Sequence, residues 1–220
     1  MKRALIIGGS RGLGLGLVRE HLTRGWHVTA TYRSPSPELE ALGAETMALD
    51  VTDTAQIGAL ASRLAGQTFD LLFVNPGIMA SRLPVSQAAP ADIEAMMLVN
   101  AISPIRVADA LAGYVAAGGV VGFMTSILGS IGTNEDGRME LYRASKAALN
   151  SLVRSFRARH ATADFTVLAL HPGVVRTSMG GPTAPLDIET SVRGLADTIE
   201  ARRGIGGAAF VDYRNEVIPW

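Results

Sequence analysis

The order of short apolar runs along the chain constrains its fold more than any other feature. Runs short enough to be strands recur from one end to the other, at 4–7, 27–32, 45–50, 69–74, 119–125, 165–171 and 208–212. The segments between them carry apolar residues at intervals of three and four, as Leu13, Leu17 and Leu22 do, which is typical of helices. Strand followed by helix, repeated, predicts a parallel sheet, because parallel strands need a long crossover between them.

Right-handed crossovers place helices on both faces of such a sheet. The predicted fold class is therefore α/β: a single-domain, Rossmann-type, doubly wound parallel sheet of about seven strands with helices on both faces. No linker, repeat or shift in composition divides the chain, so residues 1–220 are expected to form one domain. Two stretches rich in glycine, proline and polar residues, 126–138 and 172–186, are long enough to be functional loops.

Charge and cysteine counts exclude several classes of protein. The 20 basic residues balance 20 acidic ones, which argues against a nucleic-acid binder held by phosphate neutralisation. The chain has no cysteine and its four histidines show no ligand spacing, so neither disulfides nor a metal site are predicted. For His171, a hydrogen-bonded structural role is favoured over catalysis. The apolar runs are strand-sized and predict neither a membrane span nor a leader, so a cytoplasmic protein is expected.

A glycine-rich turn follows the first predicted strand and leads into a helix. Glycines at such a turn let the backbone pass close to a ligand, and the helix start offers free N–H groups to a pyrophosphate. The spacing is GxxxGxG, not the strict GxGxxG fingerprint, and an ordinary strand-to-helix turn is the alternative. The residues expected around the cofactor here are Gly8, Ser10, Arg11, Gly12, Leu13 and Gly14.

Two arginines indicate which dinucleotide is preferred. An acidic residue about 20 positions beyond the turn would bind the ribose of NAD, but none occurs between Glu20 and Glu38. Instead, Arg33 ends the second strand and Arg11 lies within the turn, so that two guanidinium groups can converge on a 2′-phosphate. NADP(H) is therefore predicted in preference to NAD(H). The alternative is that both arginines are merely solvated surface charges.

A tyrosine and a lysine lie four residues apart on the helix predicted after the 126–138 loop. Residues with this spacing share a helix face, so the Lys146 ammonium can stabilise the Tyr142 phenolate and lower its pKa from about 10. Such a pair can act as a general acid/base on a carbonyl or alcohol oxygen. Only Lys2 and Lys146 are lysines among the 20 basic residues, so a lysine here is more than a chance surface cation. A solvated surface pair is the alternative.

Taken together, these motifs resemble the short-chain dehydrogenase/reductase family. In the family's order they are the glycine turn, Asn75-Pro76-Gly77, Ser126, Tyr142 with Lys146, and Pro172-Gly173. The segments 126–131, 142–150, 171–177 and 218–220 are most similar to the C-factor-like or sniffer-like branch. That branch contains carbonyl reductases and proteins first known for signalling roles.

The resemblance implies roles for four residues. Tyr142 would be the acid/base, and Lys146 would lower its pKa and hold the nicotinamide ribose. Ser126 would donate a hydrogen bond to the substrate oxygen, with Ser130 as a weaker rival and a turn-capping serine as the alternative. Asn100 would hold a water that links Lys146 to solvent, unless its amide is simply satisfied by backbone.

The resemblance also implies the rest of the cofactor site. Asp50 and Val51 would flank the adenine, although Asp50 could equally cap the next helix. The remaining residues expected to line the cofactor are Asn75, Pro76, Gly77, Pro172, Gly173, Val175 and Thr177, of which the last two would meet the carboxamide.

Three positions depart from the family pattern. Ile7 replaces a threonine whose hydroxyl braces the glycine turn, Pro76 replaces an alanine, and Val74 replaces an asparagine.

The function expected is reduction of an aldehyde or ketone by NADPH, or oxidation of the alcohol. The alternative is a C-factor-like signalling or partner-binding protein that uses NADP(H) as a structural or sensing ligand. Segments 80–89, 126–138 and 172–186 would shape the pocket for this small molecule. A homo-dimer or homo-tetramer is expected, formed through the two long helices that end near Ala116 and His160.

Overall fold

The computed structural model describes residues 1–220 and contains one sheet of seven parallel strands. The strands are β1 (Arg3–Ile7), β2 (His27–Tyr32), β3 (Glu45–Ala48), β4 (Phe69–Val74), β5 (Val115–Met124), β6 (Phe165–His171) and β7 (Ala208–Asp212). Their order across the sheet is β3-β2-β1-β4-β5-β6-β7. The predicted fold class is confirmed.

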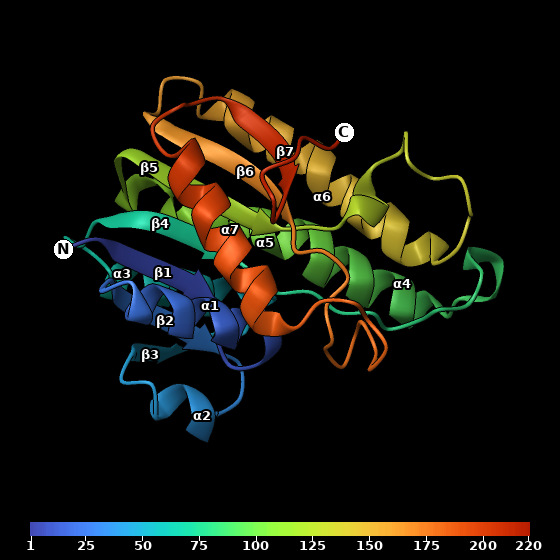
Figure 1. The fold of residues 1–220 in the computed structure, drawn as a ribbon, viewed down its shortest axis with the longest axis horizontal. Coiled ribbons are helices and arrows are strands. Elements are labelled where there is room, and N and C mark those ends of the chain that lie inside the picture. The colour runs from blue at the N-terminus through green and yellow to red at the C-terminus, as the bar shows by residue number, and fades with distance from the viewer.

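Seven α-helices accompany the sheet. They are α1 (Gly12–Thr23), α2 (Pro37–Glu40), α3 (Thr54–Arg63), α4 (Pro90–Met97), α5 (Ser103–Leu111), α6 (Glu140–Arg159) and α7 (Ile188–Arg202). Helices α1 and α7 lie on the near face of the sheet in Figure 1, and α3, α5 and α6 lie on the far face.

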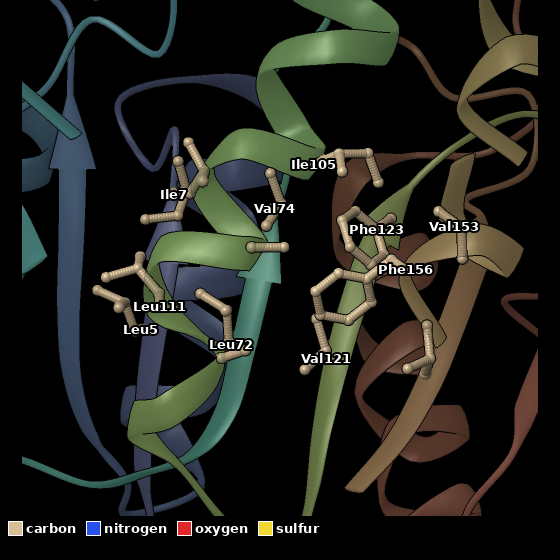
Figure 2. Close-up of a cluster of buried hydrophobic side chains, with 14 of the residues drawn as sticks. Leu5, Ile7, Leu72, Val74, Ile105, Leu111, Val121, Phe123, Val153 and Phe156 are labelled. Atoms are coloured by element: carbon tan, nitrogen blue, oxygen red, sulfur yellow. The ribbon is translucent and has the colours of Figure 1, made fainter. Parts of the chain in front are cut away.

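Alternation of apolar side chains along each strand gives the molecule two cores. In β1, Leu5 and Ile7 point to one face, and Ala4 and Ile6 to the other. The first face packs against α3, α5 and α6, as Figure 2 shows for part of the cluster, with Phe123 and Phe156 in contact edge to face. The second packs against α1 and α7. Strands buried on both faces explain the continuous apolar runs of the sequence.

Strand β5 begins four residues earlier than the sequence predicts. Its register with β4 shifts between Phe69, which pairs with Val115, and Leu71, which pairs with Val120. The shift occurs around Gly118, whose φ of +70° is left-handed. Because the glycines there carry no side-chain pattern, the sequence gives no sign that the strand already pairs before them.

One helical segment is longer and more apolar than the strand-sized runs noted in the sequence. Residues 90–114 are long and apolar enough to cross a membrane, with a mean hydropathy of 1.3, but 56% of the apolar window is buried inside the fold. Val107 and Leu111 in α5 pack against the sheet. The composition of this segment is that of a core helix.

The strand order reverses between β1 and β4, which places a crevice at the carboxyl ends of these two strands. In open α/β sheets, ligands bind at this switch point. The glycine turn follows β1, and Asn75 follows β4. The loops after β4, β5 and β6 leave the sheet on the same side, at the right of Figure 1. The motifs singled out in the sequence therefore meet along one edge of the sheet.

Candidate active site

The glycines of the first turn are each required by the backbone. Gly8 and Gly12 have left-handed φ values of +82° and +53°. A Cβ on Gly14 would lie only 2.0 Å from the Gly8 carbonyl oxygen and 2.7 Å from Nδ2 of Asn75. Helix α1 can therefore approach the end of β1 only because residue 14 has no side chain.

The start of α1 carries unpaired donors. The N–H groups of Gly12, Leu13 and Gly14 donate no hydrogen bond within the fold, and the first turn of the helix holds no acidic residue. These donors and the positive end of the helix dipole suit an anion. Ser10 is held from the other side, because Ser36 Oγ donates to its carbonyl oxygen at 2.8 Å. The turn thus fits the pyrophosphate of a dinucleotide.

Thr31 braces this turn and was missed in the sequence. The Gly8 N–H donates to Thr31 Oγ1 at 3.0 Å, and the Gly9 N–H donates to the Thr31 carbonyl oxygen at 2.8 Å. Thr31 follows Ala30, which pairs with Ile6, so it lies beside Ile7. A hydroxyl from the neighbouring strand therefore contacts the turn although position 7 has none. Strand register is the signal that could have revealed it.

Asn75 and Pro76 hold the other side of the turn. Nδ2 of Asn75 donates to the Gly8 carbonyl oxygen at 3.0 Å, and its backbone N–H donates to Ile7. The Pro76 ring packs against Gly8, where an added Cβ would lie 3.1 Å from its Cγ. Both residues lie in the crevice as expected, and the Asn75 amide is already engaged in fixing the backbone.

Arg11 and Arg33 are exposed and make no hydrogen bond or ion pair. Most of the other arginines have such partners, so these two guanidinium groups are free to meet a phosphate. The positive charge of Arg33 lies close enough to Asp50 to act on its carboxylate. Hydrogen bonds from Thr52 hold the pKa of Asp50 below its usual value, and the Arg33 charge adds to this effect.

Asp50 is not a helix cap, so that alternative is wrong. Its carboxylate accepts hydrogen bonds from the N–H (2.9 Å) and the hydroxyl (2.7 Å) of Thr52. The cap of α3 is Asp53, which accepts from the N–H groups of Ala55 and Gln56. Asp50 and the half-buried Val51 lie in the loop after β3, where the predicted contact with adenine stays a prediction.

Lys146 is buried in helix α6. Its side chain carries Nζ to the Met124 carbonyl oxygen, to which it donates at 3.0 Å, and the residue is only 2% exposed. Burial lowers the pKa of Lys146 to about 8. Nζ lies 5.8 Å from the centre of the Tyr142 ring. Because Tyr142 is also buried, the alternative of a solvated surface pair is wrong.

The pKa of Tyr142 moves in the opposite direction from the one predicted. Burial raises it to about 12, since the phenolate would have to form in an apolar environment. The nearby ammonium does not offset this effect, because it is bonded to the Met124 carbonyl oxygen and no hydrogen bond joins it to the phenol. In this structure Tyr142 is therefore a protonated acid.

Gly77 lies next to the buried ammonium of Lys146. A Cβ added to it would lie 3.4 Å from Nζ of Lys146 and 3.6 Å from Oδ1 of Asn100. That Gly77 lies beside these two residues was not predicted from the sequence, and its contact with the cofactor stays a prediction.

The Asn100 amide is fully engaged with the protein. Oδ1 accepts from the Ile78 N–H at 2.7 Å, while Nδ2 donates to the Ile78 carbonyl oxygen at 2.9 Å and to Ser145 Oγ at 3.0 Å. The residue lies in a single π-helical turn, Leu98–Ile102, between α4 and α5. The side chain fixes the segment after β4 against α6, as in the backbone-satisfied alternative. The predicted role of Asn100, binding a water that links Lys146 to solvent, stays a prediction.

Ser126 lies at the carboxyl end of β5, where its Oγ accepts from the Leu128 N–H at 3.2 Å. This contact is the one expected if Ser126 only caps the turn. It uses Oγ as an acceptor, however, and leaves the hydroxyl hydrogen free to donate. The Oγ of Ser130 is buried without any hydrogen-bond partner. Both serines thus keep an unused donor near the carboxyl ends of the strands.

Asn150 positions the Ser126 turn and was given no role in the sequence analysis. Its Oδ1 accepts from Thr125 Oγ1 at 2.8 Å, and its Nδ2 donates to the Gly129 carbonyl oxygen at 3.2 Å. A Cβ on Gly129 would lie 2.9 Å from the Lys146 carbonyl oxygen, so the turn packs directly on α6. Asn150 lies eight residues after Tyr142, and this position in the sequence does not reveal that its side chain contacts the loop before the helix.

The residues after β6 form a loop held by contacts within it and by one hydrogen bond from α7. Gly173 has a φ of +81°, and the Pro172 carbonyl oxygen accepts from Ser191 Oγ at 2.6 Å. Val175 is buried and pairs with Leu186, and Thr177 Oγ1 accepts from the Gly180 N–H at 3.1 Å. The predicted carboxamide contacts therefore lie on one ordered loop.

His171 makes no hydrogen bond, so the expected hydrogen-bonded role is wrong. Its Nδ1 is buried without a partner, and burial lowers the pKa of the ring to about 4. The imidazole is neutral at pH 7 and is buried at the end of β6.

Comparisons with known proteins identify the family of this chain. The short chain dehydrogenase family model matches residues 2–185. C-signal of Myxococcus xanthus is 35% identical over 164 residues, which cover 74% of this chain and 99% of that protein.

Two solved structures are similar over the whole chain. A short-chain dehydrogenase/reductase from Burkholderia multivorans with bound NADP is 43% identical, with a TM-score of 0.97 over 100% of this chain and 99% of that one. A carbonyl reductase from Pseudomonas aeruginosa PAO1 in complex with NADP is 42% identical, with a TM-score of 0.91 over 100% of both chains. The chain therefore belongs to the short-chain dehydrogenase/reductase family of oxidoreductases, in its C-factor-like or sniffer-like branch.

Proposed function

We propose that this protein is an NADP(H)-dependent reductase of aldehydes or ketones, which can also oxidise the corresponding alcohol. The observation that carries the proposal is the buried ammonium of Lys146 beside the Tyr142 ring, with the Gly77 backbone next to it. A buried lysine with no carboxylate partner lowers the stability of the fold, and its use at a reaction centre explains why it is present. The similar structures that contain NADP support the choice of cofactor.

The cofactor would be held along the carboxyl ends of the strands. The free N–H groups at the start of α1 would bind the pyrophosphate. Arg11 and Arg33, which have no carboxylate partners, would bind the 2′-phosphate that distinguishes NADP from NAD. Lys146 would hold the nicotinamide ribose. When bound, NADPH supplies the hydride.

Tyr142 would supply the proton at the substrate oxygen. With its pKa near 12 the phenol is protonated at neutral pH, so it is ready to donate in the direction of reduction. The Ser126 hydroxyl, whose hydrogen is free, would donate to the same oxygen as negative charge develops on it. In alcohol oxidation the phenolate is needed, so that direction is expected to become faster as pH rises.

The test is replacement of Tyr142 by phenylalanine, which removes the proton donor and little else. Reduction of a panel of carbonyl compounds by NADPH is followed by nicotinamide absorbance. Tyr142→Phe is expected to lower kcat/KM by about 10²–10⁴-fold while NADPH binding is retained. Tyr114→Phe is the matched control, because the Tyr114 hydroxyl donates to the Ala61 carbonyl oxygen, away from the site. Unchanged turnover in Tyr142→Phe would show the mechanism to be wrong.

A signalling or partner-binding protein that uses NADP(H) as a structural or sensing ligand is the second candidate. It is favoured by the likeness to C-signal, which extends over 99% of that protein. An intact Tyr142 and Lys146 pair supports catalysis, because a sensor needs no acid/base. A protein that binds NADPH tightly but reduces none of the panel would favour the second candidate.

We further expect a cytoplasmic homo-dimer or homo-tetramer, with contacts through the exposed sides of α5 and α6.

A further inference from the structure

Tyr142 lies in the first turn of α6, and that turn has no cap. The helix begins at Glu140, and the N–H groups of Glu140, Leu141 and Tyr142 donate no hydrogen bond within the fold. Met139, the residue before the helix, makes no side-chain hydrogen bond to any of them. The proposed acid/base is therefore carried by the part of the helix that its own backbone secures least.

The chain is also strained immediately before this turn. Met139 has a φ of 56° and a ψ of 43°, a left-handed conformation that costs free energy for any residue other than glycine. Gly137, two residues earlier, is left-handed as well, with a φ of +64°. Such a conformation persists only where surrounding contacts hold it. The start of α6 therefore depends on contacts made by side chains.

Arg143 makes these contacts from within the helix, one residue after the tyrosine. It is only 7% exposed. Its Nε donates to the Arg138 carbonyl oxygen at 2.8 Å, and its Nη2 donates to Asp136 Oδ1 at 2.8 Å. Its backbone N–H donates to the Met139 carbonyl oxygen, also at 2.8 Å. Three donors of one residue thus hold three residues of the turn that precedes α6.

Asp136 is the charged partner of Arg143 in this turn. Its carboxylate also accepts from the Arg138 N–H at 3.0 Å and from Nη2 of Arg138 at 2.8 Å. Hydrogen bonds from Arg138 and from Arg143 lower the pKa of Asp136 to about 2, so this group is a carboxylate at neutral pH. The charge of the buried Arg143 guanidinium is therefore compensated, as a buried cation requires.

The other end of α6 carries an arginine that makes similar contacts. Arg157, half-buried in the last turn of the helix, donates to the carbonyl oxygens of His160, Ala161 and Ala163. It lies about 22 Å along the helix from Tyr142. Arg143 and Arg157 thus both hold the chain beyond a helix end, but only Arg143 lies beside the proposed acid/base.

We propose that Arg143 is a positioning residue for Tyr142: by holding residues 136–139 it fixes the first turn of α6 and, with it, the phenol. This inference rests on the proposed function. In the reduction the substrate oxygen gains the Tyr142 proton, and the carbonyl carbon gains a hydride from NADPH, which becomes NADP⁺. A displaced phenol would slow this proton transfer and leave the binding of NADPH unchanged.

The first test replaces Arg143 by methionine and, separately, by lysine, which keeps the charge but lacks the fork of donors. Reduction of the panel compound with the highest kcat/KM is measured, and kcat is expressed per NADPH-binding site so that unfolded protein is not counted. We expect kcat to fall about 10²-fold in Arg143→Met and about tenfold in Arg143→Lys, with KM and the Kd of NADPH within about threefold. Asp136→Asn keeps an acceptor for Nη2 and should lose less than Arg143→Lys.

Arg157→Met is the matched control. It removes an arginine with similar contacts from the same helix, so it should lower Tm but keep kcat within about twofold of wild type. Unchanged kcat in Arg143→Met would overturn the inference. An equal loss of kcat in Arg157→Met would do the same, because both arginines would then act only through the stability of the helix.

A solvent isotope effect gives a readout that stability alone would not move. If proton donation by Tyr142 is slowed, the ratio of kcat in H₂O to kcat in D₂O should be larger in Arg143→Lys than in wild type. The ratio in Arg157→Met should equal that of wild type. A wild-type ratio in Arg143→Lys would show that the phenol is not displaced and would refute the inference.

Hydrogen exchange separates this inference from the proposed function. Exchange of backbone amides in peptides that cover 137–146 is followed by mass spectrometry in the protein loaded with NADPH. It should be faster in Arg143→Lys than in wild type and unchanged in Arg157→Met. If no carbonyl compound is reduced, the proposed function fails, but faster exchange still supports the hold of Arg143 on the turn that carries Tyr142. Unchanged exchange in Arg143→Lys rules that hold out, whether or not the protein is an active reductase.

Discussion

The cofactor side and the substrate side of the site are built in different ways. On the cofactor side, backbone atoms define the shape: Gly8 and Gly12 have left-handed φ values, Gly14 has no room for a side chain, and Thr31 and Asn75 fix the turn by hydrogen bonds. On the substrate side, long loops carry flexible side chains around Tyr142 and are joined by a few contacts of Arg82 and Glu140. Figure 1 shows these loops extending beyond the sheet, whereas the glycine turn lies against it.

The difference teaches where change can be tolerated. A side chain added at Gly14 must displace backbone, and the displacement would reach β1, α1 and β4 together. A side chain changed in the loops can be accommodated by rotation of its neighbours, so its effect is on which substrate fits. Lys146 lies between the two sides, with its stem in the core and Nζ at the boundary.

The largest effect is expected from Gly14→Ala, which tests the rigidity of the cofactor side. The added Cβ would lie 2.0 Å from the Gly8 carbonyl oxygen, and backbone cannot move away cheaply. We expect loss of NADPH binding and a decrease in the free energy of unfolding of about 3 kcal/mol, which corresponds to a decrease in Tm of about 6–12 °C. Calorimetry and NADPH titration measure the two effects.

Gly58→Ala is the matched control for this substitution. Gly58 lies in α3, and a Cβ there would meet nothing within 4 Å. Because alanine favours the helix, this variant should be more stable than wild type by about 0.5–1 kcal/mol and should bind NADPH unchanged. If Gly14→Ala bound NADPH normally, the cofactor side would be as adaptable as the substrate side, and the comparison would fail.

Lys146→Met tests the boundary between the two sides. Burial of the ammonium lowers the pKa of Lys146 to about 8, against about 10.4 in an unfolded chain, which is a cost to the free energy of unfolding of about 3 kcal/mol at neutral pH. Methionine removes this cost but leaves the Met124 carbonyl oxygen without its donor, so a net gain of about 2 kcal/mol is expected. The variant should be more stable and nearly inactive, as thermal unfolding and turnover assays would show.

The pH dependence of wild type gives an independent check. Below pH 8, Lys146 is charged in both the folded and the unfolded protein, so burial of the ammonium lowers the free energy of unfolding by its full amount. Between pH 8 and about 10.4 the folded protein loses the proton that the unfolded chain keeps, so stability rises with pH by up to about 1.4 kcal/mol per unit. Above pH 10 the unfolded chain loses the tyrosine proton that the folded protein keeps, because the pKa of Tyr142 is raised, so stability falls with pH. Lys146→Met should lack the rise between pH 8 and 10, and its persistence there would contradict this assignment.

The sequence predicts the parts of this molecule that depend on periodicity and local spacing. The alternation of strand and helix patterns was sufficient to predict the parallel sheet. The positions of Gly14, Tyr142 and Lys146 were sufficient to identify them as candidate residues of one site. Each of these features is readable because its residues are close in sequence or repeat regularly.

Contacts that depend on register or burial could not be read in the same way. The Thr31 brace depends on which residue of β2 lies beside Ile7, and the role of Asn150 depends on the turn at Gly129 packing on α6. The direction of the Tyr142 pKa was predicted wrongly, because spacing shows that a cation is near but does not show how deeply the phenol is buried. The apolar cluster that contains Tyr142 draws Met79, Met96, Met139 and Met179 from four separate segments, so no local sequence pattern predicts it.

The smallest effect is expected from Arg33→Ala, which tests the one part of the cofactor side that depends on exposed side chains. Since the guanidinium has no partner to lose, stability should change by less than about 0.5 kcal/mol. Loss of one charge-assisted contact with the 2′-phosphate should raise the KM for NADPH about tenfold and leave the KM for NADH unchanged. Arg63→Ala, an exposed arginine at the end of α3, is the control. Equal losses for both cofactors would contradict the phosphate assignment, and no loss for either would mean that backbone alone selects the cofactor.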